Sequence, residues 1–93
     1  MRVGVLQLDV YIPAAQSLKD KRSALDGLTG QLRSRFNVAV AQVNADEKWQ
    51  RATVGIATVG DDRQYIEGVL RRVTSWLRQY RTVELVRVEQ DLW

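Results

Sequence analysis

The spacing of apolar residues changes from every second position to a helical period within the first third of the chain. Across residues 3–12, one side of an alternating pattern is fully apolar, with Leu6, Leu8, Val10 and Ile12. This alternation predicts a β-strand. Pro13 has no backbone donor and ends the strand.

A helix is predicted to follow this strand. Ser17 is a good N-cap residue, and Asp20 three positions later gives an acidic version of the capping box. At about 100° per residue, one side of the helix gathers Leu18, Leu25, Leu28, Leu32 and Phe36. Lys21 projects into the middle of this apolar stripe, at a position where a leucine would be expected.

Four more segments complete the pattern. A second strand over residues 36–43 is apolar on both faces, and polar residues 44–48 form a turn before a third strand over residues 49–59. Asp61 or Asp62 caps a second helix, whose core stripe is Ile66, Val69, Leu70, Val73, Leu77 and Tyr80. A last strand covers residues 83–89, and its mixed pattern does not decide which face is buried.

The order of these segments predicts the fold. Two βαβ units in the order βαββαβ give an α+β, ferredoxin-like fold, in which both helices lie on one face of a four-stranded antiparallel sheet. In this topology the first and third strands are central and the other two are edges. Residues 1–93 form a single domain, which is a typical size for one core.

Composition narrows the chemistry. The chain has no cysteine and no histidine, which removes thiol chemistry, disulfides, imidazole bases and almost every zinc or iron site. We therefore expect no metal and no cofactor. No apolar stretch approaches the roughly 20 residues of a membrane span, so we expect a cytoplasmic location and no membrane partner.

Positive charge gathers on the predicted helices. The net charge is +3 and the pI is about 9.7, which favours an anionic partner. Lys19, Lys21 and Arg22 lie in the first turns of the first helix, where the helix dipole disfavours cations. Lys19 and Arg22 could form an anion site beside the N-terminal amides of that helix. Salt bridges from them to Asp20, Asp26 or acids of a loop are the alternative.

Lys21 itself has two interpretations. Either its stem packs on the core while its ammonium extends past the helix end to water, which the pattern favours, or it is a buried catalytic lysine. With the cations that project from both helices, it completes the predicted anion-binding set: Lys19, Lys21, Arg22, Arg33, Arg71 and Arg78. This set would contact the phosphates of structured RNA. The alternative is an ordinary solvated helix surface.

The sheet face away from the helices is unusually apolar for a surface. It is predicted to collect Val3, Val5, Tyr11, Ala39, Ala41, Val43, Trp49 and Ala57. The second strand is also an edge without lysine, proline or internal charge, so its sequence lacks the usual protection against edge pairing. Both features predict a homodimer. The alternative is that the C-terminal Leu92-Trp93 folds across this face.

Two other functions of the same fold find little support. RNA-recognition motifs stack bases on aromatic residues of the first and third strands, but the third strand here lacks that aromatic pattern. Acylphosphatases hold phosphate in a glycine-rich loop after the first strand, and here residues 13–16 contain neither glycine nor arginine. No carboxylate is grouped with a nucleophile, so we predict that the protein is not an enzyme.

Two segments together resemble the YlxP-like family of small bacterial proteins of unknown function. They are Ser17-Leu18-Lys19-Asp20-Lys21-Arg22, and Phe36-Asn37-Val38-Ala39-Val40-Ala41 followed by Trp49-Gln50-Arg51-Ala52-Thr53-Val54-Gly55. The resemblance implies a ferredoxin-like fold, and it marks Ser17, Leu18, Lys19, Lys21 and Arg22 as signature positions. Gln42 departs from the family, which often has an acid there.

The genes of this family are commonly found near those of translation initiation factor two and ribosome-binding factor A. The resemblance therefore implies a role related to RNA or the ribosome. We expect a non-enzymatic RNA- or ribosome-associated accessory domain that binds ribosomal RNA or a ribosomal subunit through its basic helix surface. The alternative is a homodimeric protein–protein interaction module that uses the apolar sheet face and Trp49.

Overall fold

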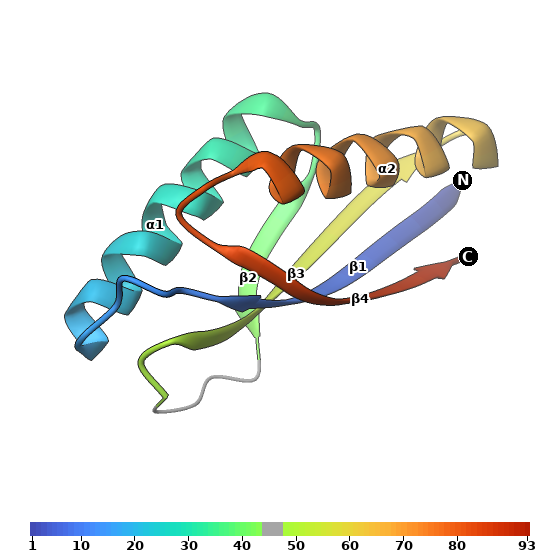
Figure 1. The fold of residues 1–93 in the computed structure, drawn as a ribbon. Coiled ribbons are helices and arrows are strands. Elements are labelled where there is room, and N and C mark those ends of the chain that lie inside the picture. Colours follow the sequence, from blue (N-terminus) through green and yellow to red (C-terminus); the bar gives the residue numbers. More distant parts are fainter. Residues whose placement is uncertain (44–47) are drawn as a thin grey trace.

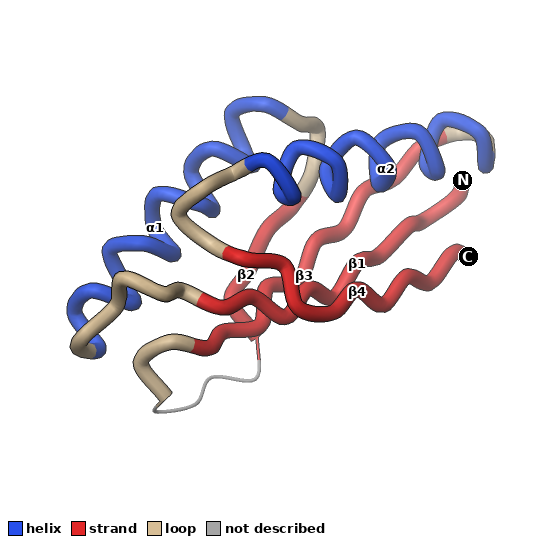
Figure 2. Tube along the Cα trace, viewed as in Figure 1, coloured by secondary structure: helices blue, strands red, loops and turns tan. Residues whose placement is uncertain are grey.

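Two helices lie on one face of a four-stranded antiparallel sheet in the computed structural model, which describes residues 1–43 and 48–93 (Figures 1 and 2). The elements are β1 (Arg2–Tyr11), α1 (Leu18–Arg35), β2 (Ala39–Val43), β3 (Arg51–Gly60), α2 (Arg63–Gln79) and β4 (Glu84–Leu92). The strand order is β2-β3-β1-β4, so β1 and β3 are central. The predicted ferredoxin-like fold is confirmed. Of the predicted turn at 44–48, residues 44–47 lie outside the described residues.

The core lies between the sheet and the helices. Leu6, Leu8 and Val10 of β1 are fully buried, as are Leu28 and Leu32 of α1. The inward side of β1 also contains Gly4, and a Cβ there would overlap the side chain of Ile66 in α2. A side chain at this position would push α2 away from the sheet, so glycine permits the close packing of α2 on β1.

Both helices begin at a capping side chain. The Ser17 Oγ accepts a hydrogen bond of 3.0 Å from the backbone N–H of Asp20, and Asp62 Oδ1 accepts one of 2.8 Å from Tyr65. The Asp20 carboxylate reaches back to the backbone N–H of Gln16. The N-cap at Ser17 is therefore confirmed, and of the two candidates for the second helix Asp62 is the cap.

All four strands differ from their predicted bounds, and β2 and β4 differ by three residues at one end. β3 begins at Arg51, so Trp49 and Gln50, predicted to be in this strand, lie before it. β2 begins at Ala39, because the backbone N–H of Val38 bonds the Phe36 carbonyl in a local turn instead of a neighbouring strand. β4 continues to Leu92, and the next residue, Trp93, exchanges two backbone hydrogen bonds with Val3. The C-terminal end extends the sheet alongside β1. The alternative that it folds across the sheet face is therefore wrong.

Candidate binding surface at the start of the first helix

Lys21 connects the start of α1 to the connection between β2 and β3. Its side chain is only 3% exposed, and its Nζ donates a hydrogen bond of 2.8 Å to the backbone oxygen of Lys48. We predicted an ammonium that reaches water, and this prediction is wrong. The ammonium is covered by the chain before β3, and a carbonyl replaces water as a partner. Lys21 is thus absent from the surface on which it was predicted to bind anions.

Two further hydrogen bonds hold the segment before β3. Ile12 donates its backbone N–H to the Gln50 carbonyl at 2.8 Å, and the Gln50 Nε2 donates to the Pro13 carbonyl at 3.3 Å. Together with the bond from Lys21 to Lys48, they fix residues 48–51 against the end of β1 and the start of α1. We call this part of the surface, lined by Tyr11, Lys48, Trp49, Gln50 and Arg51, the Trp49 corner.

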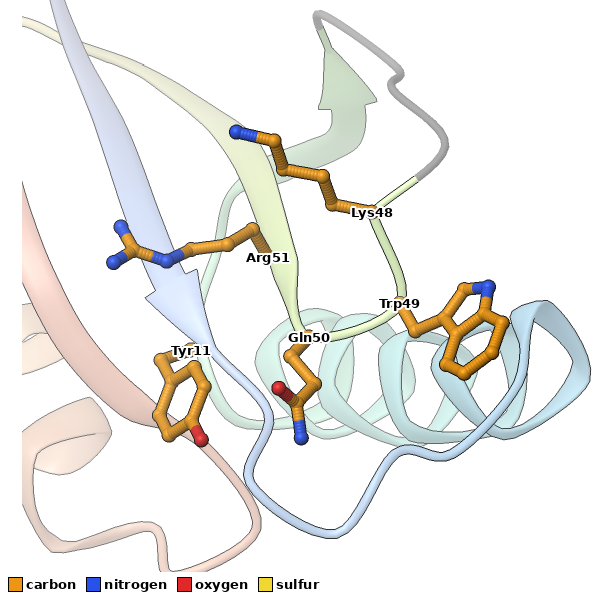
Figure 3. A pocket seen from close by; sticks show the side chains of 5 residues that line it. All are labelled: Tyr11, Lys48, Trp49, Gln50 and Arg51. Carbon is orange, nitrogen blue, oxygen red and sulfur yellow. The ribbon is translucent and has the colours of Figure 1, made fainter.

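The Trp49 corner presents a large aromatic side chain to solvent. Trp49 is 53% exposed, although both of its sequence neighbours have a fixed backbone atom. In Figure 3 the Lys48 and Arg51 side chains point towards β1, whereas the Trp49 indole points away from them. The open depression here measures about 540 Å³, and the described residues that line it include the cation Arg51 and the aromatic rings of Tyr11 and Trp49. These side chains fit an anionic, ring-containing ligand.

Lys19 and Arg22 lie exposed in the first turns of α1. The Lys21–Lys48 hydrogen bond joins these turns to the Trp49 corner. Within residues 1–43 and 48–93, Asp20 and Asp26, the neighbouring acids expected to neutralise them, form no ion pair. The Asp20 carboxylate instead accepts from the backbone of the preceding loop. The start of α1 therefore keeps its surface cations available to an external anion.

The predicted basic helix surface is divided in two by the orientation of α1. Arg33 donates from Nη2 to the Val40 carbonyl at 2.8 Å, so this side of α1 faces β2. Arg22 lies eleven residues earlier, and at about 100° per residue it points in nearly the same direction. The other side of α1 faces α2, where Arg35 lies 5.3 Å from the ring centroid of Trp76. Arg22 and Arg33 therefore point away from the arginines of α2.

The arginines of α2 form their own surface. Arg71 and Arg78, seven residues apart, are exposed on the same side of the helix, and Arg72 is exposed beside them. Nitrogens of Arg71 and Arg72 both lie within 4.0 Å of the position that a Cβ on Gly68 would take. Glu67 pairs with Arg63. Within the described chain, these three arginines make no ion pair.

The free edge of β2 is protected in a way that its own sequence does not reveal. In a strand, the backbone groups of successive residues point to opposite neighbours. The hydrogen bond from Ile12 to Gln50 shows which residues of β3 direct their backbone groups to β1, and the alternate residues direct theirs to β2. In the register of β2 on β3, the backbone groups of Val40 therefore point to the free edge. The guanidinium of Arg33 donates a hydrogen bond to the Val40 carbonyl oxygen. A charge from α1 therefore protects one carbonyl of this edge, although the sequence of β2 itself contains no such residue.

The outer face of the sheet is apolar where β2, the second half of β3 and the first half of β1 meet, as predicted. Further along the same face, Thr53 Oγ1 donates a hydrogen bond of 2.8 Å to Asp9 Oδ1. Cross-strand pairs place Val5 beside Ala57, and Ala57 beside Ala39. A shallow hollow of about 260 Å³ is lined by Val5, Ala39, Val40, Ala41, Val43, Gly55, Ile56 and Ala57. Val3 pairs with Val59 on one side and with Trp93 on the other, and those two partners are 55% and 64% exposed.

The structure separates the predicted interface residues. Tyr11 and Trp49 belong to the Trp49 corner, at the end of the sheet, whereas the valines and alanines line the hollow. Sequence analysis missed Val59 and Trp93. Val59 continues the alternation of its strand and could have been found, but the position of Trp93 depends on the β1–β4 register.

Two other types of site receive no support. Among the described residues, no three side chains of the histidine, cysteine, aspartate and glutamate types come together as possible metal ligands. In the same part of the chain, no helix is both long enough and apolar enough to span a membrane.

The chain matches known proteins over nearly its whole length. The model of DUF503, a family described as proteins of unknown function, matches residues 3–90. The uncharacterized protein YlxP of Bacillus subtilis (strain 168) is 30% identical over 82 residues, which cover 88% of this chain and 89% of YlxP. A de novo designed protein, Foldit4, has a similar fold, with a TM-score of 0.52 and 17% identity over 100% of this chain and 97% of that one.

Proposed function

We propose a function for this chain, which belongs to the DUF503 family of proteins of unknown function: it is a non-enzymatic accessory domain that binds RNA. Its partner is ribosomal RNA or a ribosomal subunit, and contact is made with phosphates through the start of α1. Lys19 and Arg22 are the main phosphate contacts. The Trp49 corner, which the Lys21–Lys48 bond joins to this end of α1, adds Trp49.

The observation that carries this proposal is the hydrogen bond from Lys21 to Lys48. It brings the cationic first turns of α1 against the cationic Trp49 corner, although the two segments are far apart in sequence. Among the described residues, Lys19, Arg22 and Arg51 form no ion pair, and a surface with such cations has a potential that attracts polyanions. The arginines of α2 form a second, separate cationic surface that adds to this attraction.

Binding to ribosomal RNA and to ribosomal subunits across a salt series tests the proposal. Affinity should fall steeply as salt rises, since each phosphate contact releases counterions. Replacing two contacts in a Lys19→Gln/Arg22→Gln variant should lower the slope of log affinity against log salt by about 2. The matched variant Arg71→Gln/Arg78→Gln carries the same change in net charge on the other surface.

The comparison between the two variants decides which surface binds. The proposal expects a larger loss of affinity from the α1 variant. A larger loss from the α2 variant would assign the contact to α2 instead. If the wild-type protein binds no RNA at low salt, the proposed function is wrong.

A second candidate function is a homodimeric interaction module, and the outer sheet face favours it. The hollow is lined by small uncharged side chains, and the exposed Val59 and Trp93 flank it. A second copy is the occupant that fits best, because an isologous contact pairs the same small apolar face with itself and leaves both α1 surfaces free. Arg33 already occupies one carbonyl of the β2 edge, so we place the contact on the face and not on the edge.

Sedimentation at tens of micromolar tests this second candidate. A dimer that becomes a monomer in a Val59→Asp variant would support the face-to-face contact. Val86 is a matched control, since it is similarly exposed (51%) but lies on β4 outside the hollow, and Val86→Asp should leave the dimer intact. A wild-type monomer at this concentration would exclude the dimer.

A further inference from the structure

Among the described residues, the exposed indole of Trp49 has no ring contact or hydrogen bond that explains its position. Large aromatic side chains usually bury most of their surface, and Trp76 does so by stacking on Tyr80 at 4.8 Å and meeting Phe36 edge-on at 6.2 Å. Trp49 makes no ring contact of this kind within the described residues and is 53% exposed. Its apolar surface is therefore available to a partner.

The backbone on both sides of Trp49 is fixed. Lys48 is held through its carbonyl by the ammonium of Lys21, and Gln50 is held through its carbonyl and its side chain by Ile12 and Pro13. A side chain presented from a fixed backbone loses less conformational entropy on binding than one presented from a free loop. The buried charge of Lys21 thus has a function at the surface, because it holds the Trp49 corner in place.

The surroundings of Trp49 favour a nucleic acid base over an apolar protein surface. The Trp49 indole points away from Lys48 and Arg51 (Figure 3), and the turns of α1 that the Lys21–Lys48 bond joins to the Trp49 corner carry Lys19 and Arg22. An apolar protein patch would leave these cations desolvated without a counter-charge. An unpaired nucleotide has a ring to stack on the indole and a phosphate for the neighbouring cations, which is the usual combination in sites for single-stranded nucleic acid.

We infer that Trp49 stacks on an unpaired base, so that the RNA bound by this surface contains a single-stranded segment. This inference rests on the proposed function and deepens it, since phosphate contacts alone would not distinguish paired from unpaired RNA. The depression of about 540 Å³ at the corner lies within the size range of small-ligand sites. Duplex RNA keeps its bases stacked on one another and offers no free ring to the indole.

The test compares two RNA probes, a single-stranded oligonucleotide and a blunt duplex of the same strand, at one salt concentration. Trp49→Ala should lower affinity for the single strand by about 5- to 100-fold, given the usual contribution of one stacked base, and should change duplex affinity less than about 2-fold. Trp49→Phe retains a ring and should recover most of the loss. Trp93→Ala removes another exposed tryptophan, and it should change neither affinity.

Each other outcome overturns the inference in a distinguishable way. If Trp49→Ala leaves both affinities unchanged while Lys19→Gln/Arg22→Gln lowers them, stacking is excluded but the phosphate contact stands. If Trp49→Ala lowers both affinities equally, the indole does not read unpaired bases. If the wild-type protein binds neither probe, the proposed function fails together with this inference. Circular dichroism of each variant checks that the fold is retained.

Discussion

The Nζ of Lys21 and the backbone oxygen of Lys48 lie 2.8 Å apart, in a hydrogen bond that joins residues 27 positions apart in sequence. The lysine comes from the buried side of α1, and the carbonyl comes from the chain just before β3. The bond fixes the Trp49 corner against the helix that carries Lys19 and Arg22. The buried ammonium of Lys21 thus contributes to the surface by holding the Trp49 corner in place.

This relationship predicts that Lys21→Met lowers stability. The methionine fills the space of the stem but leaves the Lys48 carbonyl without this donor, and a lost buried hydrogen bond of this kind costs about 1–3 kcal/mol. Urea unfolding followed by circular dichroism measures the change. Lys19→Met on the exposed side of the same turn should change stability by less than about 0.5 kcal/mol. Equal stability of both variants would show that the buried ammonium does not hold the corner.

The close packing of α2 on β1 predicts opposite effects of two alanine substitutions. Gly4→Ala places a methyl group into the side chain of Ile66, and overpacking of this kind costs about 1–3 kcal/mol. Gly30 in α1 has no atom within 4 Å of its Cβ position. Gly30→Ala should therefore stabilise the protein by about 0.5–1 kcal/mol, because alanine has the higher helix propensity. Thermal or urea unfolding of the two variants shows whether the signs differ as expected.

The two candidate caps of α2 give a matched pair. Asp62 Oδ1 accepts from the N–H of Tyr65, so Asp62→Ala should lower the free energy of unfolding by about 1 kcal/mol. Among the described residues, Asp61 accepts no hydrogen bond from this end of the helix, so Asp61→Ala should have a smaller effect. If Asp61→Ala proves the more destabilising of the two in urea unfolding, the capping assignment is wrong.

The fold could be predicted from the sequence because its signals are local. The alternation in β1, the stripe of α2 and the cap at Ser17 each depend on residues within a few positions of one another. The partner of Lys21 could not be predicted in this way, since a buried lysine and a solvent-reaching lysine share the same helical position. Only the packing of the chain before β3 on α1 decides between them.

The candidate surface was predicted only in its components. Lys19, Arg22 and Trp49 were each identified, but the two segments were assigned to different surfaces because their proximity depends on tertiary contacts. In the same way, Arg33 was assigned to the exposed helix surface with Arg71 and Arg78. Its hydrogen bond to Val40 depends on which side of α1 faces β2, and periodicity alone does not give that.

Arg33 leads to the last prediction, which concerns association through the edge of the sheet. An unprotected edge strand offers its N–H and C=O groups to the edge of another molecule. In Arg33→Gln the Val40 carbonyl loses its guanidinium donor, and a neighbouring charge that repels a second cationic copy is also removed. We expect the variant to self-associate at lower protein concentration than the wild type, as measured by light scattering. Arg22→Gln carries the same change in charge on the same side of α1 but leaves the Val40 bond intact, and it should behave like the wild type. If both variants associate equally, net charge and not the capped carbonyl limits association through this edge.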